Sequence, residues 1–312
     1  MMKEIKTLNY DYGTYIGEVT MGDVENGEGT FTWNDGREYR GSFVDGLMEG
    51  YGEHTHPSGD TYKGEWKDGK FHGTGTYSWT NGNVYCGEWR NGMENGKGVG
   101  TFKETGERYE GEYVDRKRCG HGILTIPGQY TYEGEFYDNR PNGLGEMILD
   151  RGDRYVGSFK NSLPDGDGVM YYDNGSQYEG EMKNGKRDGY GVLTQHNGCI
   201  LKGDWKEGKA DGEFEHWCVD GNYAKEHWVD GELCDTVTSC ESLMNELADD
   251  TLATDKVDNL ENDMFKKGYF SEIEIDGEPS DRINDVYENN DSEENIFSNE
   301  IHEHLENKWD EN

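Results

Sequence analysis

The sequence lacks a long apolar run, and this absence excludes two classes of protein. No window approaches the about 18 consecutive apolar residues that a membrane-spanning helix needs. Hydrophobic residues make up 31% of the chain, less than a close-packed globular domain normally holds. Residues 1–6 contain no apolar segment of the kind found in signal peptides, so we expect no secretory leader.

Basic residues are scarce relative to acidic ones. The chain has 30 Lys and Arg against 66 Asp and Glu, which gives a formal net charge of −36. A surface of this sign repels nucleic-acid phosphates and anionic lipid headgroups over about 8 Å at physiological salt. We therefore expect protein partners that are basic or apolar, and no nucleic-acid partner. Association with a membrane is disfavoured by the charge.

The residues of common catalytic and metal sites are also absent in their usual arrangements. The six cysteines form no CxxC pair, which indicates free thiols in a reducing, cytoplasmic compartment. The pairs His54/His56 and His302/His304 lack further ligands at a suitable spacing. Gly-x-Ser-x-Gly is absent, and the Gly-x-Gly pairs lack the helix and the Gly-Lys-Ser/Thr of a phosphate loop. The sequence thus predicts no catalytic residue, no cofactor and no metal.

Glycine and aromatic residues are abundant, and they recur at a fixed spacing. Residues 62–77 read YKGEWKDGKFHGTGTY, and near copies follow about every 23 residues. A fixed period of this length indicates a repeat array, in which each unit buries its faces against its neighbours. The residues that open the copies are Tyr15, Tyr39, Tyr62, Tyr85, Tyr109, Tyr132, Tyr155 and Tyr178, with Leu201 in the ninth place.

Each copy has the pattern of a β-hairpin. Tyr62, Gly64 and Trp66 alternate with polar residues, so they share one face of a strand. A second turn, such as Asn81-Gly82, leads into the next copy. Dipeptides of the type that reverses strands follow the first strand of several copies: Asp45-Gly46, Asp68-Gly69, Asn91-Gly92 and Asn184-Gly185.

This pattern resembles the MORN repeat family. The signature Tyr-x-Gly-x-Trp, followed by Gly-x-x-x-Gly-x-Gly, is intact at Tyr62–Tyr77 and recurs with small departures over residues 15–216. The resemblance implies an all-β fold, an elongated, twisted, single-layer antiparallel sheet of tandem hairpins. Nine hairpins would give 18 strands, or about 85 Å at roughly 4.8 Å per strand. MORN arrays with acidic tails also resemble the radial-spoke-head MORN proteins of cilia and flagella.

The sequence divides into three regions. Residues 1–14 are a lead-in, residues 15–233 are nine repeats with a degenerate half-repeat as a cap, and residues 234–312 are an acidic tail. Residues 240–312 hold 23 acidic against 5 basic residues, so the tail is either disordered or folds on the sheet or on a partner. Two possible amphipathic helices carry their apolar residues on one face: Val257, Leu260, Met264 and Phe265, then Ile296, Phe297, Ile301, Leu305 and Trp309.

The second strand of each hairpin carries a lane of variable side chains. The position two residues beyond Gly-x-Gly holds residues such as Phe31, Tyr77 and Phe102, which we expect to pack against adjacent hairpins. The position two residues further on varies more, and a single-layer sheet has no second layer to bury it. We predict that this lane binds a basic or amphipathic helix of a protein partner, through Trp33, His56, Trp79, Ile126, Leu149 and Tyr172.

Two alternatives stay open at this point. MORN modules are often given a role at phosphoinositides or membrane surfaces, for which Arg108 and the run Arg116-Lys117-Arg118 are the candidate residues. MORN arrays also occur fused to lipid kinases and methyltransferases, so this chain could be the regulatory partner of such an enzyme. Some 80 mostly polar residues after residue 233 are too few for the catalytic domain itself. The sequence favours a non-catalytic scaffold in a ciliary, flagellar or other cytoskeletal assembly, with its partner and oligomeric state undetermined.

Overall fold

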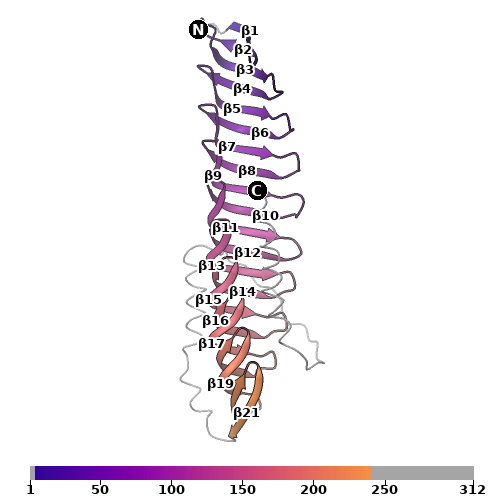
Figure 1. The fold of residues 1–312 in the computed structure, drawn as a ribbon, viewed down its shortest axis with the longest axis vertical. Coiled ribbons are helices and arrows are strands. Elements are labelled where there is room, and N and C mark those ends of the chain that lie inside the picture. Colours follow the sequence, from indigo (N-terminus) through magenta and orange to yellow (C-terminus); the bar gives the residue numbers. More distant parts are fainter. Residues whose placement is uncertain (1–3, 240–312) are drawn as a thin grey trace. The chain divides into compact units, whose positions relative to one another are not determined.

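The computed structural model describes residues 4–239, which form 21 β-strands assigned to one antiparallel sheet (Figure 1). The predicted all-β fold of tandem hairpins is therefore confirmed. No helix occurs between residues 4 and 239, and hence none that could cross a bilayer. The strands fall into two compact units, one made of residues 4–129 and 136–139 and one of residues 130–135 and 140–239.

In the first unit each strand pairs with the strand that precedes it in the chain. The lead-in is itself a strand, β1, which pairs with β2 over its whole length, and this strand was not predicted. The strands are β1 (Glu4–Tyr10), β2 (Gly13–Val19), β3 (Glu25–Trp33), β4 (Glu38–Val44), β5 (Leu47–Thr55), β6 (Thr61–Lys67), β7 (Lys70–Ser78), β8 (Val84–Arg90), β9 (Met93–Thr101), β10 (Arg108–Val114) and β11 (Lys117–Ile126).

The second unit continues the same pattern, after a strand β12 (Tyr130–Tyr137) whose residues are divided between the two units. The predicted half-repeat is a complete hairpin, and it ends beyond residue 233. The strands are β13 (Arg140–Leu149), β14 (Arg154–Lys160), β15 (Leu163–Tyr171), β16 (Gln177–Lys183), β17 (Lys186–Thr194), β18 (Ile200–Lys206), β19 (Lys209–Trp217), β20 (Tyr223–Val229) and β21 (Glu232–Ser239). The two predicted tail helices lie outside the described residues.

One tyrosine per repeat forms the centre of the core. Tyr62 is fully buried, and its hydroxyl donates a hydrogen bond to the Glu65 carbonyl at 2.8 Å. Its ring lies over Gly75, where a Cβ atom would be only 2.3–2.6 Å from the ring and its hydroxyl. The ring also meets Trp66 and Trp89 edge-on, with centroids 5.4 and 5.3 Å away, which is a favourable geometry for aromatic pairs. The repeated Tyr and Gly are therefore one packing unit.

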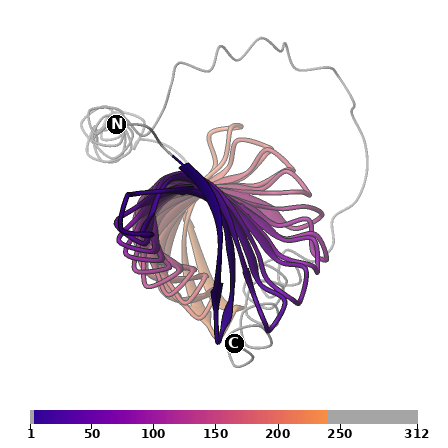
Figure 2. The ribbon, with the colours of Figure 1, turned by 90° about the horizontal axis from the view of Figure 1, so that it is seen from above.

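The first glycine of each Gly-x-Gly pair has a different role. Gly73 has a φ of 55°, and the pairing of β6 with β7 shifts register between Gly64 and Glu65. Equivalent shifts occur in other hairpins of both units, so this bulge is a feature of the repeats in general. Such bulges bend strands, and the strands of the first unit are bent along their length in Figure 2.

Because these tyrosines are buried, we expect the folded protein to lose stability at alkaline pH. Burial raises the pKa of Tyr15 and Tyr113 from 10.0 to about 12, and raises the pKa of Tyr39 even more. The pKa of each of these tyrosines is higher in the folded protein than in the unfolded chain. The stability that comes from burying the neutral side chain is therefore fully present below pH 10, and it is lost as the pH rises through the folded-state pKa. Each such tyrosine lowers the free energy of unfolding by about 1.4 kcal/mol per pH unit in that window.

The measurement is urea unfolding between pH 9 and 12, with tyrosinate absorbance followed in parallel. We expect the urea midpoint to fall above pH 10 and most of the tyrosinate signal to appear together with unfolding. A Tyr39→Phe variant is expected to show a shallower fall. Complete tyrosine titration near pH 10 in the folded protein would contradict this account of the core.

Candidate protein-binding face

Most lane residues begin a five-residue turn that joins one hairpin to the next. The Trp33 N–H donates to the Arg37 carbonyl at 2.9 Å, and the Gly36 N–H donates to the Trp33 carbonyl at 3.0 Å. These two bonds fix the backbone of the lane residue, so packing around the side chain decides its exposure. The same two bonds close the turns that begin at His56, Trp79, Leu149 and Tyr172.

In the first unit the lane contains two half-exposed tryptophans. Trp33 packs against the buried Phe31, with ring centroids 4.5 Å apart, and the Arg37 guanidinium lies 5.0 Å from its ring centroid. Trp79 packs in the same way on Tyr77, with centroids 4.6 Å apart. Each tryptophan thus has one edge held by the protein and another open to solvent.

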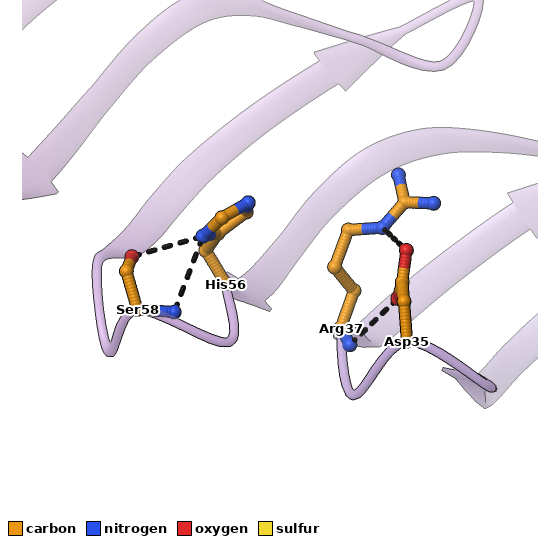
Figure 3. A network of polar contacts seen from close by, with 4 residues as sticks. All are labelled: Asp35, Arg37, His56 and Ser58. Carbon is orange, nitrogen blue, oxygen red and sulfur yellow. Dashed lines mark hydrogen bonds and ion pairs between the residues drawn. The ribbon is translucent and has the colours of Figure 1, made fainter.

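The turns beside these tryptophans carry two carboxylates, of which Asp35 is exposed and Asp60 is half-buried. Asp35 accepts hydrogen bonds from the Arg37 N–H at 3.1 Å and from its Nε at 2.9 Å (Figure 3). The backbone donor on Arg37 lowers the pKa of Asp35 below its usual value. The backbone N–H of Thr80 does the same for Asp60, which it contacts at 2.8 Å. Both carboxylates are therefore ionised at neutral pH, and they give this part of the lane a negative border.

The two histidines of the lane differ in their surroundings. His56 is exposed, and its Nδ1 lies 2.9 Å from the Ser58 hydroxyl in the following turn (Figure 3). His54 is partly buried, with its ring centroid 6.0 Å from that of Trp33. Burial lowers the pKa of His54, so this ring is neutral at pH 7. Of the two, His56 is the more exposed to a partner.

The aliphatic members of the lane are not exposed. Ile126 in the first unit is 5% exposed, and Leu149 in the second is 4% exposed. The expectation of exposed side chains does not hold for these two, because both are shorter than tryptophan and lie within the packed face. Tyr172 in the second unit is half-buried.

The basic residues considered for a membrane site do not form an open patch. Arg118 is 6% exposed, its guanidinium lies 4.9 Å from the centroid of Tyr109, and it forms an ion pair with Glu107. Arg118 is therefore a core residue, and the prediction that it belongs to an exposed basic run with Arg116 and Lys117 is wrong. The other three are exposed and each has a carboxylate partner: Arg108 with Glu110, Arg116 with Glu94 and Lys117 with Asp138.

Sequence analysis missed a group of residues in the second unit. Cys199, His216 and Cys218 place their sulfur and nitrogen atoms within 4.8 Å of one another. His216 and Cys218 are two residues apart, but Cys199 lies 17 residues before His216, and the three match no motif. The pairing of β18 with β19 is the signal that brings them together, since Ile200 opposite Trp217 sets Cys199 opposite Cys218.

Two comparisons say little about this chain. No curated protein matches the sequence. Among solved structures, a similar chain is the TCP domain of SAS-4 (dCPAP) from Drosophila melanogaster, in complex with a proline-rich motif of Ana2 (dSTIL). The two chains are 12% identical, the match covers 69% of this chain and 90% of that chain, and the TM-score is 0.23. A TM-score of this size supports no inference about function.

The comparison with protein families is decisive. The MORN repeat matches nine segments, which together cover more than half of the chain: residues 15–36, 39–61, 62–84, 85–103, 109–128, 132–154, 155–177, 178–200 and 202–223. Eight of these segments begin at the buried tyrosine of a hairpin. The chain belongs to the MORN repeat family.

Proposed function

We propose that this protein is a non-catalytic scaffold that binds a basic or amphipathic helical segment of a protein partner along the lane of the first unit. The observation that carries the proposal is the partial exposure of Trp33 and Trp79, on a face where the tyrosine that opens each repeat is buried. Partly packed tryptophans lose little conformational freedom on binding and commonly dominate binding energy at interfaces. Tyr172 offers an equivalent contact in the second unit.

The charge of this lane supports a basic partner. Asp35 and Asp60 border the two tryptophans, and hydrogen bonds keep both carboxylates ionised. A helix with one apolar face and flanking Lys or Arg would cover the rings and meet these carboxylates at the rim. The membrane alternative has no such support, because the four basic residues considered for it all pair with carboxylates.

The test compares the partners captured by the full chain and by the variant Trp33→Ala/Trp79→Ala. Tyr51→Ala is the matched control, since Tyr51 is 63% exposed and points to the opposite face of the sheet. We expect the double variant to bind a captured partner segment about 30-fold less tightly or worse, equivalent to 2 kcal/mol or more. We expect the control to bind it normally. Equal binding by all three proteins would reject the lane as the binding site.

We also propose that the protein acts in the cytoplasm, in a ciliary, flagellar or other cytoskeletal assembly. The support is family resemblance, because MORN arrays followed by acidic segments resemble the radial-spoke-head proteins. A fluorescent fusion in ciliated cells tests this proposal. Exclusive labelling of another compartment would oppose it, without bearing on the lane itself.

A further inference from the structure

Three residues with soft ligand atoms meet where β19 ends. Cys199 directly precedes β18, His216 lies in β19, and Cys218 directly follows it. The pairing of Leu201 with His216 brings these segments side by side. The Sγ of Cys218 is 3.4 Å from the Nε2 of His216, and all three ligand atoms lie within 4.8 Å of one another.

Turns hold both cysteines in place. The carbonyl of Cys199 accepts a hydrogen bond from the Gln195 N–H at 2.8 Å, and its own N–H donates to Asn197 Oδ1 at 2.9 Å. The Cys218 N–H donates to the Asn222 carbonyl at 2.9 Å. The backbone of both cysteines is therefore held in place before any ligand binds.

A buried carboxylate orients the histidine. Glu226 is 7% exposed, and it lies 2.8 Å from the Nδ1 of His216 and 2.9 Å from the Nε1 of Trp228. A carboxylate only accepts hydrogen bonds, so Nδ1 carries the proton and Nε2 presents its lone pair to the cysteines. This is the tautomer that a metal-binding histidine requires, with the carboxylate contact that commonly accompanies it.

The repeat register explains why, within residues 4–239, three such ligands meet at this place. The positions of Cys199, His216 and Cys218 are those of Arg37, His54 and His56 in an earlier repeat, two of which Figure 3 shows. In the last hairpin Ala224 and Glu226 stand where the repeat has its tyrosine and following glycine. The missing ring leaves space for the Glu226 carboxylate beside His216. These departures from the repeat pattern, in the part of the sequence that we predicted to be a degenerate cap, thus bring one set of ligands together.

We propose that Cys199, His216 and Cys218 bind Zn²⁺, with Glu226 orienting His216. Tetrahedral zinc with Zn–S near 2.3 Å and Zn–N near 2.0 Å places neighbouring ligand atoms about 3.5–3.8 Å apart. The 3.4 Å between Cys218 Sγ and His216 Nε2 is close to this spacing, and all three ligand atoms lie within 4.8 Å of one another. Two sulfurs and an imidazole favour zinc over Mg²⁺ or Ca²⁺, which prefer oxygen. A water or another ligand completes the fourth position. The prediction from sequence of no metal site considered only the His-x-His pairs, and it is revised by this proposal.

The test uses Co²⁺ as a spectroscopic substitute for Zn²⁺ in the reduced, metal-stripped full chain. We expect one Co²⁺ per chain, with a thiolate-to-cobalt charge-transfer band and strong visible bands typical of a tetrahedral site, all displaced by Zn²⁺. Cys199→Ser and Cys218→Ser are each expected to weaken the charge-transfer band or abolish it. Glu226→Gln is expected to keep the bands and to weaken affinity about 10–100-fold.

Cys86→Ser is the matched control, because Cys86 is an exposed thiol in the first unit. It is expected to bind Co²⁺ like the unmodified protein. Circular dichroism of each variant separates loss of a ligand from loss of the fold. The proposal is overturned if the unmodified protein shows no charge-transfer band, if folded Cys199→Ser and Cys218→Ser keep the full band, or if Cys199 and Cys218 form a disulfide in place of metal uptake.

Discussion

The Gly75→Ala variant is expected to lose about 3 kcal/mol of unfolding free energy, at the upper end of the usual cost of overpacking a core. The added Cβ would lie 2.3 Å from the Tyr62 hydroxyl oxygen and 2.5 Å from Cζ of its ring. The ring has no room to move away, because its hydroxyl donates to the Glu65 carbonyl and Phe71 stacks on it at 3.9 Å. Urea unfolding of the full chain measures the loss.

Gly92→Ala is the control that separates crowding from backbone strain. Gly92 has a φ of 83°, and a Cβ there would meet no atom within 4 Å. Its replacement is therefore expected to cost only the strain of a left-handed residue, about 1 kcal/mol. Equal losses for the two variants would contradict the packing of the tyrosine ring over the glycine.

The ninth repeat shows how the sheet packs when both the tyrosine and the glycine beneath it are replaced. Leu201 replaces the tyrosine, and Phe214 replaces the glycine that the tyrosine would cover. Phe214 is 1% exposed, and its ring lies so close to Gly203 that a Cβ there would be 2.6 Å from it. The phenylalanine ring thus fills the space from the opposite strand. Two departures that look independent in the sequence are one compensated change.

The hairpins were predictable because their determinants are local. Alternation of Tyr, Gly and Trp defines the buried face of each strand, and Asp-Gly or Asn-Gly defines each reversal. Strand β1 was missed because Glu4–Tyr10 carries none of these features and is ordered by its pairing with β2. A strand that depends on its neighbour leaves little signal in its own sequence.

Side-chain depth was less predictable than strand position. Alternation correctly placed Trp33 and Leu149 on the same face of their strands, but one is half-exposed and the other is buried. The outcome depends on side-chain length and on neighbours that only the structure supplies. The cluster of Cys199, His216 and Cys218 has a similar cause, since it requires the exact register of β18 with β19. Nothing in the spacing of the three residues reveals it.

The Arg118→Ala variant is expected to lose about 3–5 kcal/mol of unfolding free energy, as when one member of a buried ion pair is removed. The side chains of Arg118 and Glu107 are only 7% and 13% exposed. The guanidinium also lies over the rings of Tyr109 and Phe102, at 4.9 and 5.5 Å from their centroids. Alanine would leave the Glu107 carboxylate without this partner and open a gap beside the two rings.

Two further variants decide whether burial is the cause. Arg108→Ala breaks an exposed ion pair with Glu110, in which the two side chains are 46% and 53% exposed, and it is expected to cost less than about 1 kcal/mol. Arg118→Met with Glu107→Gln removes both charges while keeping much of the volume, and it is expected to recover most of the loss seen with alanine. If Arg118→Ala is as mild as Arg108→Ala, burial of the Arg118–Glu107 pair does not stabilise the sheet. If the double replacement is no better than alanine, the buried charge pair is itself what stabilises this part of the sheet.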